Sequence, residues 1–260
     1  LAAAGHVPVA YDNLGHGHRE AVKWGPLIEA DLADRAALAR ALARHSIAAV
    51  IHLAAFIEVG ESVREPGKYF RNNFVHALGL FETMLDAGVK AIVVSSTASV
   101  YGVPERTPLT EDHPTRPINP YGESKLMVER ALDWFGRAQG LNWLALRYFN
   151  AAGADPDGEI GEDHEPESHL IPIACQAALG RRAPFEIYGT DYPTPDGTAI
   201  RDYVHVADLA AAHLAALDDL LAGGASGAFN LGTGVGHSVA SVIQAVEAAA
   251  GRSVPVRHAA

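Results

Sequence analysis

The stretch AIVVSS, residues 91–96, is an apolar run that ends in two serines. Two further apolar runs flank it along the chain, AAVIHLAA at 48–55 and WLALRYFN at 143–150. Continuously apolar runs of this length predict strands that are buried on both faces of a sheet. The segments at 34–46 and 68–88, which precede the runs at 48–55 and 91–96, have helical periodicity. This alternation predicts an α/β fold, a doubly wound parallel sheet with crossover helices.

The sequence changes character after Asn150. Residues 151–169, AAGADPDGEIGEDHEPESH, are rich in Gly, Pro, Asp and His, which is typical of an irregular loop that builds a binding site. We therefore expect one domain at 1–150 and a smaller one at 151–260. In the second part we expect helices at 169–180, 206–221 and 238–250, strands at 185–189 and 228–232, and a polar loop at 190–203.

The composition is that of a globular protein. Of 260 residues 48% are hydrophobic, the net charge is −11 and the pI is near 5.6. No basic cluster exceeds the pair Arg181-Arg182, which argues against nucleic acid or an anionic membrane as a partner. No apolar run reaches the ~18 residues of a membrane span. Cys175 is the single cysteine, so we expect a buried thiol and a cytoplasmic protein.

Tyr121 and Lys125 are four residues apart at the predicted start of a helix, so their side chains share one face. Lowering a tyrosine pKa from about 10 to about 7 needs roughly 4 kcal/mol, which a nearby ammonium and a cationic ligand could supply. Such a tyrosine is a general base. Three hydroxyls, Ser95, Ser96 and Thr97, end the strand at the edge where such sheets bind ligands. The alternatives are a packed tyrosine beside a solvated lysine, and hydroxyls that only form a turn.

Asp12 follows the apolar run at 7–11, where a dinucleotide-binding fold places an acid on the ribose hydroxyls. An Asp-Asn turn is the alternative. The glycine loop that such a fold needs should precede this acid by about 20 residues, so we expect it, with the first strand, before Leu1. Asp31 is either an adenine contact or the N-cap of the next helix.

Two further site types are disfavoured by the sequence. His164 and His169 are five residues apart with Pro166 between them, so they cannot share a helical face as in zinc proteases. We expect no metal. No G-x-S-x-G motif occurs, which weakens a hydrolase interpretation.

Together these motifs resemble the extended short-chain dehydrogenase/reductase family, and within it the UDP-hexose 4-epimerases. The similarity runs through nearly the whole chain. Its most specific parts are YGTDYPTPDGTAIRDYVHV at 188–206 and NLGTGVGHSV at 230–239, and it also includes DNL, VIHLAA, VGESV, NN, SSTASVYG, YGESK, LRYFN and GED, in the same order as in that family.

The resemblance implies a Rossmann-type domain at 1–150 that holds NAD and a portion at 151–260 that holds a UDP-sugar, interleaved with the first domain and truncated at its C-terminus. It implies that Tyr121 removes the 4-hydroxyl proton of UDP-glucose or UDP-galactose, that Lys125 holds the nicotinamide ribose and lowers the tyrosine pKa, and that Thr97 supplies a hydroxyl. The sugar passes through a transient 4-keto form, and NAD is returned unchanged. By this resemblance both ends of the fold lie outside the sequence, so we expect the chain alone to be inactive.

The resemblance also assigns binding residues. On the cofactor side they are Asp12, Asn13, Asp31, Leu32, Leu53, Ala54, Ala55, Asn73, Ser95, Tyr121, Lys125 and Phe149. On the substrate side they are Thr97, Asn150, His169, Leu170, Tyr188, Arg201 and Tyr203, with Arg201 on the diphosphate and His169 where an asparagine is common. The resemblance further implies a homodimer that pairs the helices around 73–85 and 121–137.

Three alternatives remain. The substrate is another UDP-sugar, an N-acetylhexosamine or a pentose, or the protein is a non-catalytic NAD sensor or scaffold of the same fold. Related dehydratases carry an Asp-Glu pair after the threonine, whereas Ala98 and Ser99 follow Thr97 here. Epimerisation is therefore favoured over elimination.

Overall fold

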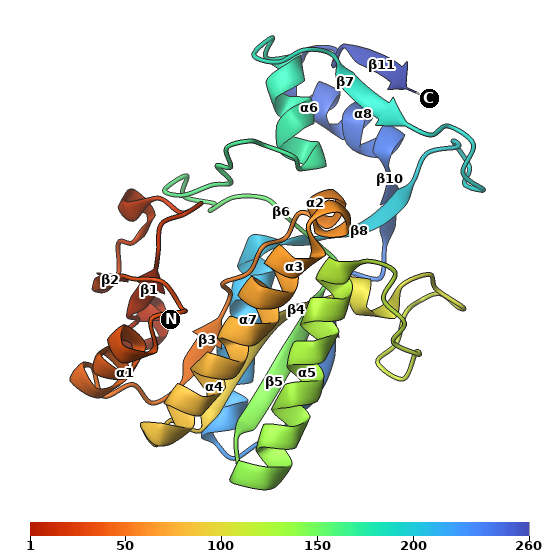
Figure 1. Cartoon of the computed structure of the whole chain (residues 1–260). Helices are drawn as coiled ribbons and strands as arrows, with labels where there is room; N and C mark the ends of the chain where they lie inside the picture. Colours follow the sequence, from red (N-terminus) through yellow and green to blue (C-terminus); the bar gives the residue numbers. More distant parts are fainter. Residues whose placement is uncertain (260) are drawn as a thin grey trace. The chain divides into compact units, whose positions relative to one another are not determined.

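The computed structural model describes residues 1–259 and divides into two units (Figure 1). The first unit contains Leu1–Tyr148 and Ala210–Leu231, and the second contains Phe149–Leu209 and the chain from Gly232 onward. The change of unit after Tyr148 lies two residues before the expected boundary at 150. The chain then returns to the first unit, so the two are interleaved along the sequence.

A four-stranded parallel sheet forms the centre of the first unit. Its order is β3 (Val50–His52), β4 (Ala91–Thr97), β5 (Asn142–Tyr148), β9 (Gly227–Leu231). Strands β1 (Ala10–Asp12) and β2 (Leu27–Glu29) form a separate two-stranded parallel sheet. The three apolar runs are therefore parallel neighbours, as predicted, and the carboxyl ends of their strands meet at one edge.

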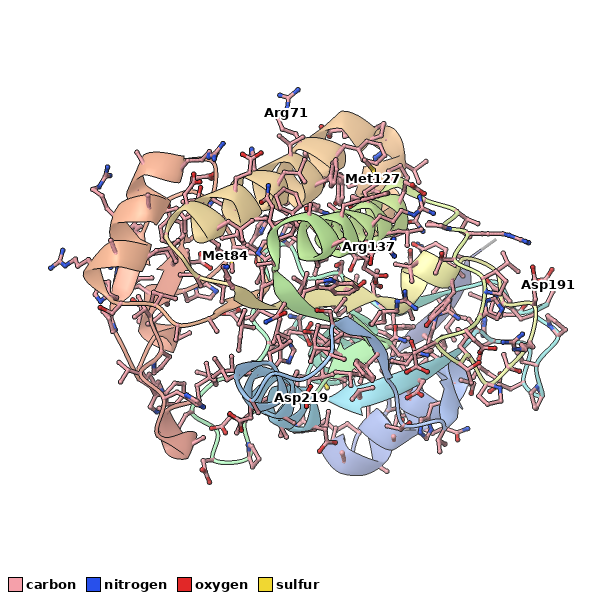
Figure 2. The ribbon with its side chains drawn as sticks, turned by 90° about the horizontal axis from the view of Figure 1, so that it is seen from below. Arg71, Met84, Met127, Arg137, Asp191 and Asp219 are labelled. Atoms are coloured by element: carbon pink, nitrogen blue, oxygen red, sulfur yellow. The ribbon has the colours of Figure 1, made fainter. Side chains whose placement is uncertain are left out.

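Helices cover both faces of this sheet, which explains why β4 and β5 are apolar throughout. On one face, alternate residues such as Ile92 and Val94 pack with α1 (Arg35–Arg44), α4 (His76–Asp86) and α5 (Pro120–Gln139). On the other face, Ala91 and Val93 pack with α7 (Val206–Leu221). Figure 2 shows the helices that carry Met84 and Met127 on one side of the sheet and the helix that carries Asp219 on the other.

The helix predicted at 68–88 is present from Pro66 to Asp86, but a π-helical turn interrupts its α-helical hydrogen bonding. A short helix α2 (Val59–Arg64) is followed by α3 (Pro66–Tyr69), by a π-helical turn η3 (Phe70–Val75) and then by α4. π-turns inside helices are rare and frequently accompany functional sites. The remaining 3₁₀ turns are η1 (Ala2–Ala4), η2 (Arg19–Ala21) and η4 (Ala98–Tyr101).

The second unit contains two small sheets. Strands β6 (Asn150–Ala152), β8 (Ile200–His205) and β10 (Gly236–Ser238) form one in the order β10-β8-β6, and β7 (Phe185–Tyr188) pairs with β11 (Val256–Ala259) in the other. Helices α6 (Leu170–Ala178) and α8 (Val239–Ala250) pack on β7 through Ala174, Val246 and Ile187.

Two expectations for the second unit were wrong. The segment at 190–203, expected as a polar loop, contains the start of β8, because that strand is stabilised by pairing with the distant β6 and β10 rather than by an apolar pattern of its own. Cys175 is exposed rather than buried, since the face of α6 that packs on the core carries Ala174, Ala177 and Ala178 and does not include Cys175. Within residues 1–259, no helix combines the length and apolarity needed to cross a membrane.

Candidate active site

Tyr121 lies in the first turn of α5, and Lys125 lies one turn later. The helix begins at Asn119, whose Oδ1 accepts a hydrogen bond from the Gly122 backbone N at 2.8 Å, and Pro120 occupies the first helical position, where no backbone donor is needed. This start fixes the direction in which Tyr121 and Lys125 project. Tyr121 is half-buried, and Lys125 is 4% exposed.

Gly122 permits the approach of α5 to the end of β4. A Cβ at this position would lie 2.7 Å from the Ser99 carbonyl oxygen, so any side chain would push the helix away from η4. Thr97 is the last residue of β4 and is buried, and its Oγ1 accepts a hydrogen bond from the Ser99 backbone N at 3.1 Å. The glycine therefore brings the Tyr121 and Thr97 side chains together.

The pKa of Tyr121 shifts in the direction opposite to the sequence-based expectation. Burial raises it, and a hydrogen bond with the Thr97 side chain is the opposing contribution. Lys125 was expected to lower this pKa, but it does not contribute to the shift. Instead its Nζ donates to the Ser95 carbonyl oxygen at 2.8 Å. The protein alone therefore favours the neutral phenol.

Lys125 is a buried cation with donors to spare. Burial lowers its pKa to about 8, although the nearby Glu129 carboxylate opposes this shift. An ammonium group has three N–H donors, and the Ser95 carbonyl oxygen is the one hydrogen-bond acceptor that residues 1–259 give it. The remaining donors suit hydroxyl oxygens of a ligand such as a ribose, so this position fits the expected dinucleotide.

His52, at the end of β3, was not identified from the sequence. It is buried, and burial together with the positive charge of Lys125 lowers its pKa to about 3. The imidazole is therefore neutral at physiological pH, and it lines the side of Lys125. The signal available in the sequence was a single polar residue inside the apolar run at 48–55.

A buried ion pair lies behind the lysine. Arg147 on β5 donates to Glu129 on α5 through Nε at 3.0 Å and Nη2 at 2.6 Å, and a third donor, Nη1, reaches the Tyr101 hydroxyl at 2.8 Å. Ser96 donates to Glu129 at 2.5 Å. Of the three hydroxyls predicted at the end of β4, Ser96 therefore faces this network rather than the candidate site. Glu129 follows Lys125 by four residues on one helical face, which is a pattern the sequence contained.

Tyr148 is a second tyrosine at the same sheet edge that was not identified. Burial raises its pKa to about 12, the Ser95 side chain opposes this shift, and the charge of Tyr121 raises it further. Its hydroxyl also hydrogen-bonds His213 Nε2 on α7. Because each phenolate disfavours the other, Tyr148 stays protonated when Tyr121 ionises.

Asp12, Asn13 and Asp31 lie together at the carboxyl ends of β1 and β2, with Leu32 beside Asp31. Asn13 Nδ2 donates to Asp31 at 2.8 Å, and the Leu14 backbone N donates to Asp12 at 2.7 Å. A backbone hydrogen bond from Ala33, followed by the Asn13 amide, lowers the pKa of Asp31.

The alternative role of Asp31 as a helix cap was wrong. The N-cap of α1 is Asp34, whose carboxylate accepts from the Ala37 backbone N at 2.9 Å. Asp31 instead closes the turn before that helix by accepting from the Ala33 backbone N at 2.8 Å. Its carboxylate is thus part of the Asp12 and Asn13 group and not of α1.

Leu53, Ala54 and Ala55 form the irregular segment after β3, and Leu53 is exposed. Asn73, in the π-turn, fixes this segment. Its side chain accepts from the Phe56 backbone N at 2.8 Å and donates to the Phe56 carbonyl at 2.9 Å and to Ser124 Oγ at 3.2 Å. Both amide hydrogens of Asn73 are engaged, so its position favours support of the loop over direct contact with a cofactor.

The second unit carries the residues expected on the substrate side. Asn150 on β6 pairs with Tyr203 on β8 and donates to the Asp202 carbonyl at 3.0 Å. Arg201 and Tyr203 alternate on one face of β8, where burial raises the pKa of Tyr203 and the Arg201 charge lowers it. Arg201 is exposed, and its guanidinium donates to the carbonyl of its neighbour Ile200 at 2.8 Å. The structure thus brings three of the predicted residues together.

The other predicted residues of this unit lie elsewhere in it. The ring of Phe149 lies against Gly232, where a Cβ would be 2.9 Å from it. His169 and Leu170 form the N-cap and first residue of α6. Tyr188 ends β7 and is exposed, and its hydroxyl donates to Glu186, which raises its pKa. Within residues 1–259 no hydrogen bond joins Tyr188 to Arg201.

Comparisons with known proteins extend over the whole chain. Residues 1–232 match the model of the "NAD dependent epimerase/dehydratase family". The UDP-glucose 4-epimerase of Rhizobium meliloti (strain 1021) is 52% identical over 259 residues, which are 100% of this chain and 79% of that protein. The crystal structure of UDP-glucose 4-epimerase from Brucella ovis in complex with NAD is 49% identical with a TM-score of 0.98, covering 100% of this chain and 80% of that one.

A further crystal structure, UDP-glucose-4-epimerase from Stenotrophomonas maltophila with bound NAD and formylated UDP-arabinopyranose, is 40% identical with a TM-score of 0.95. It covers 100% of this chain and 80% of its own. At these values the similarity concerns the sequence and the fold together, and the predicted Rossmann-type α/β fold is confirmed.

Proposed function

This chain belongs to the NAD dependent epimerase/dehydratase family, and we propose that it interconverts UDP-glucose and UDP-galactose by NAD-dependent epimerisation at C4. The proposal rests on the hydrogen bond between the Thr97 and Tyr121 side chains and on the buried Lys125, one turn further along α5, whose ammonium group has unused N–H donors. The similarity to UDP-glucose 4-epimerases supports the reaction and the cofactor.

Tyr121 accepts the proton of the 4-hydroxyl group, and the Thr97 hydroxyl orients that group. Because burial raises the pKa of Tyr121, the tyrosine becomes a base only when positive charge is placed beside it. When bound, NAD supplies a hydride acceptor that later returns the hydride. Lys125 holds the ribose hydroxyls through the N–H donors that the Ser95 carbonyl oxygen leaves unused.

The nucleotides are assigned to different groups of residues. The carboxylate of Asp12 accepts hydrogen bonds from free ribose hydroxyls and repels a 2′-phosphate, which favours NAD over NADP. Arg201 is exposed and donates to one protein acceptor, the Ile200 carbonyl oxygen, so its planar fork is available for a diphosphate. Asn150 and Tyr203, its neighbours in the sheet, complete the group assigned to the UDP-sugar.

The reaction is tested by following both directions. The protein with NAD is incubated with UDP-galactose and separately with UDP-glucose, and both nucleotide sugars are measured. We expect the two incubations to converge on one ratio without net reduction of NAD. UDP-N-acetylglucosamine and UDP-xylose serve as competing substrates, and faster conversion of either would change the assigned sugar. No conversion of any of them would contradict the proposal.

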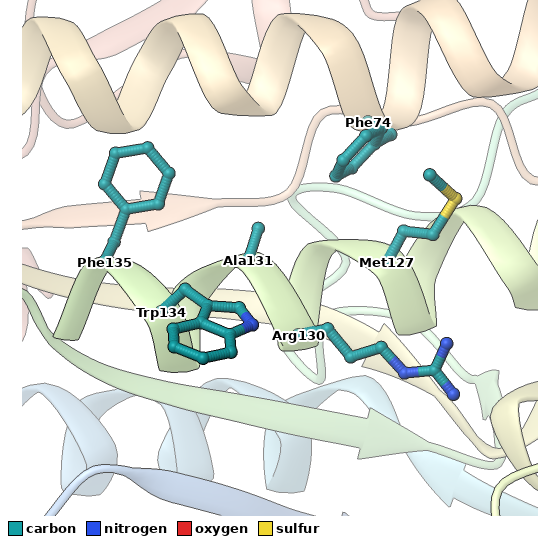
Figure 3. A pocket seen from close by; sticks show the side chains of 6 residues that line it. All are labelled: Phe74, Met127, Arg130, Ala131, Trp134 and Phe135. Atoms are coloured by element: carbon teal, nitrogen blue, oxygen red, sulfur yellow. The ribbon is translucent and has the colours of Figure 1, made fainter. Parts of the chain in front are cut away.

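We also infer a homodimer formed by η3, α4 and α5. A hollow of about 370 Å³ on this face is lined by Phe74, Met127, Arg130, Ala131, Trp134 and Phe135 (Figure 3). Trp134 is 67% exposed, and Val75 on the adjacent turn is exposed as well. Large apolar side chains clustered on two neighbouring helices are typical of an interface between subunits.

The dimer is tested by light scattering at micromolar concentration. Replacing Trp134 by Glu places a charge in the apolar patch, and we expect the mass to fall from dimer to monomer. Trp24→Glu is the matched control, because Trp24 is also exposed, at 52%, but lies outside the patch. A monomeric wild type, or equal behaviour of the two variants, would contradict the interface.

For the location of the protein we infer the cytoplasm. Cys175 is a free and exposed thiol, and such thiols persist in reducing compartments. The proposed nucleotide cofactor and nucleotide-sugar substrate agree with this location.

A further inference from the structure

The loop that precedes α6 gathers four side chains with metal-binding chemistry. Glu162, His164, Glu167 and His169 each offer one donor atom, and these four atoms all lie within 4.8 Å of one another. All four residues belong to the second unit and precede the first residue of α6. Because residues 162–169 are not helical, His164 and His169 do not need the four-residue spacing of a shared helical face in order to meet.

The separations match those of a four-coordinate site. His169 Nδ1 lies 2.8 Å from Glu162 Oε1 and 3.0 Å from Glu167 Oε1, and His164 Nδ1 lies 3.5 Å from Glu162 Oε1 and 3.9 Å from Glu167 Oε2. In a tetrahedral zinc site with bonds of about 2.0 Å, the ligand atoms are about 3.3 Å apart. The three distances to Glu162 Oε1 and Glu167 Oε1 lie within about 0.5 Å of this value, and the distance from His164 to the second oxygen of Glu167 is longer, so a bound ion would draw His164 and Glu167 closer together.

Hydrogen bonding within the loop leaves one atom unexplained. His164 Nδ1 is buried and finds no hydrogen-bond partner among residues 1–259, since 3.5 Å is too long for an effective bond to a carboxylate. An unpaired buried polar atom costs free energy. A cation between the two imidazoles and the two carboxylates would satisfy this nitrogen and neutralise the adjacent negative charges.

Glu167 is held in place by backbone N–H groups of the loop and by Arg182. Its Oε1 accepts from the backbone N of Ser168 and of His169, both at 2.8 Å, while Arg182 donates to its carbonyl oxygen at 3.1 Å. The carboxylate side chain is 5% exposed. Metal ligands in proteins are commonly oriented by such surrounding hydrogen bonds, and here they turn the second oxygen of Glu167 toward His164.

We propose that Glu162, His164, Glu167 and His169 bind one divalent transition-metal ion, and that the ion is Zn²⁺. Imidazole nitrogen and carboxylate oxygen in four-fold coordination are ligands suited to zinc, whereas an all-oxygen set would suit Mg²⁺ or Ca²⁺. With four protein ligands the site is structural, and it fixes the loop at the N-terminus of α6. Ligation of His169 through Nδ1 also places its remaining proton on Nε2, so this ring presents a donor away from the metal.

The proposal is tested by direct metal binding. The protein is treated with a chelator, dialysed and titrated with Co²⁺ and with Zn²⁺. We expect saturation at one equivalent per chain, a visible Co²⁺ absorption band of the intensity typical of four-coordinate sites, and loss of that band on addition of one equivalent of Zn²⁺. Zn²⁺ should also raise the midpoint temperature of unfolding, because it binds the folded chain.

Variants assign the site to this loop. His164→Ala and Glu167→Gln should each weaken Zn²⁺ binding at least tenfold and abolish the thermal shift. Glu162→Gln provides a third variant at an exposed residue, in case substitution of the buried Glu167 impairs folding. His258→Ala, an exposed histidine on β11, should leave binding unchanged. Absence of stoichiometric binding by the wild type would overturn the proposal. Equal binding of Zn²⁺ by the His164 and His258 variants would also overturn it, because the four side chains would then be joined only by hydrogen bonds.

Discussion

The end of β4 and α5 in the first unit differs from the edge of β8 in the second in how polar side chains are held. Thr97 and Lys125 are buried and hydrogen-bonded to backbone atoms within the strand or turn where β4 ends. Arg201 on β8 is exposed and bonds to its neighbour Ile200, and Tyr188, at the end of β7 in the same unit, is exposed and bonds to Glu186, two residues away. Groups assigned to the sugar hydroxyl and to the ribose are thus oriented before any ligand binds, whereas groups assigned to the charged nucleotide are exposed. Substitutions in the first region should alter turnover or stability, and those in the second should alter affinity.

The largest expected effect tests the first region. Tyr121→Phe removes one hydroxyl and keeps the ring, so packing is retained while the proposed base is lost. General-base catalysis typically contributes 10² to 10⁴ in rate, and we expect kcat for UDP-galactose to fall by at least about 10²-fold. The affinity for UDP, measured by calorimetry, should change little.

The control for this variant is Tyr192→Phe, because Tyr192 is an exposed tyrosine of the second unit with no assigned role. Its kcat should match that of the wild type. A Tyr121→Phe protein with nearly normal kcat would show that orientation of this hydroxyl before binding is irrelevant to catalysis.

The buried ion pair of the first region gives the next effect, on stability. Arg147 and Glu129 have side chains that are 8% and 5% exposed. Arg147→Met leaves the Glu129 carboxylate buried without its partner, which typically costs about 3–5 kcal/mol. Urea unfolding should show a loss of this size. Arg116→Met breaks an ion pair with Glu105 in which the arginine is 74% exposed, and it should cost at most about 1 kcal/mol. Equal losses of unfolding free energy in the Arg147→Met and Arg116→Met variants would mean that burial does not strengthen the Arg147–Glu129 ion pair relative to the exposed one.

The second region is tested by Arg201→Lys, which keeps the charge and removes the planar fork. Because Lys cannot make the bidentate contact with a diphosphate, we expect KM for UDP-galactose to rise about tenfold, or about 1.4 kcal/mol, with little change in kcat. Arg252→Lys, at another exposed position of the same unit, is the control. A fall in kcat without a change in KM would place Arg201 with the catalytic residues.

The sequence predicted the parts of the fold that have strong local patterns. The apolar runs at 48–55, 91–96 and 143–150 contain β3 and all but one residue of β4 and of β5, and the α/β class is confirmed by the matching structures. Helix α7 begins and ends where its alanine-rich pattern does. Tyr121, Lys125 and Thr97 could be grouped because parallel strands and the helices that follow them share one edge of a sheet.

What was missed depends on contacts between distant residues. Strand β8 is formed by pairing with β6 and β10, and no hydrophobic pattern within residues 200–205 predicts it. The direction of the Tyr121 pKa shift follows from burial, which spacing cannot reveal. The meeting of His164 and His169 is another case, because the path of an irregular loop is not encoded in periodicity.

The smallest expected effect concerns the charge of Lys125. Burial lowers its pKa from 10.5 to about 8, so below pH 8 the folded protein contains a buried cation that the unfolded chain would solvate. This charge destabilises the fold. As the pH rises from about 8 toward 10.5, the folded protein releases the proton while the unfolded chain still holds it, so the contribution of Lys125 to the free energy of unfolding increases with pH in that window.

Removing the charge should therefore remove this pH dependence. Between pH 7 and pH 9 we expect the stability difference between the wild type and Lys125→Met to change by about 1 kcal/mol in favour of the wild type, measured by urea unfolding of both proteins at each pH. Lys90→Met, which removes a charge at an exposed position, should show no comparable change. If the stability difference between the wild type and Lys125→Met were constant with pH, burial would not perturb the Lys125 ammonium group. The two regions would then not differ in how they hold their cationic side chains.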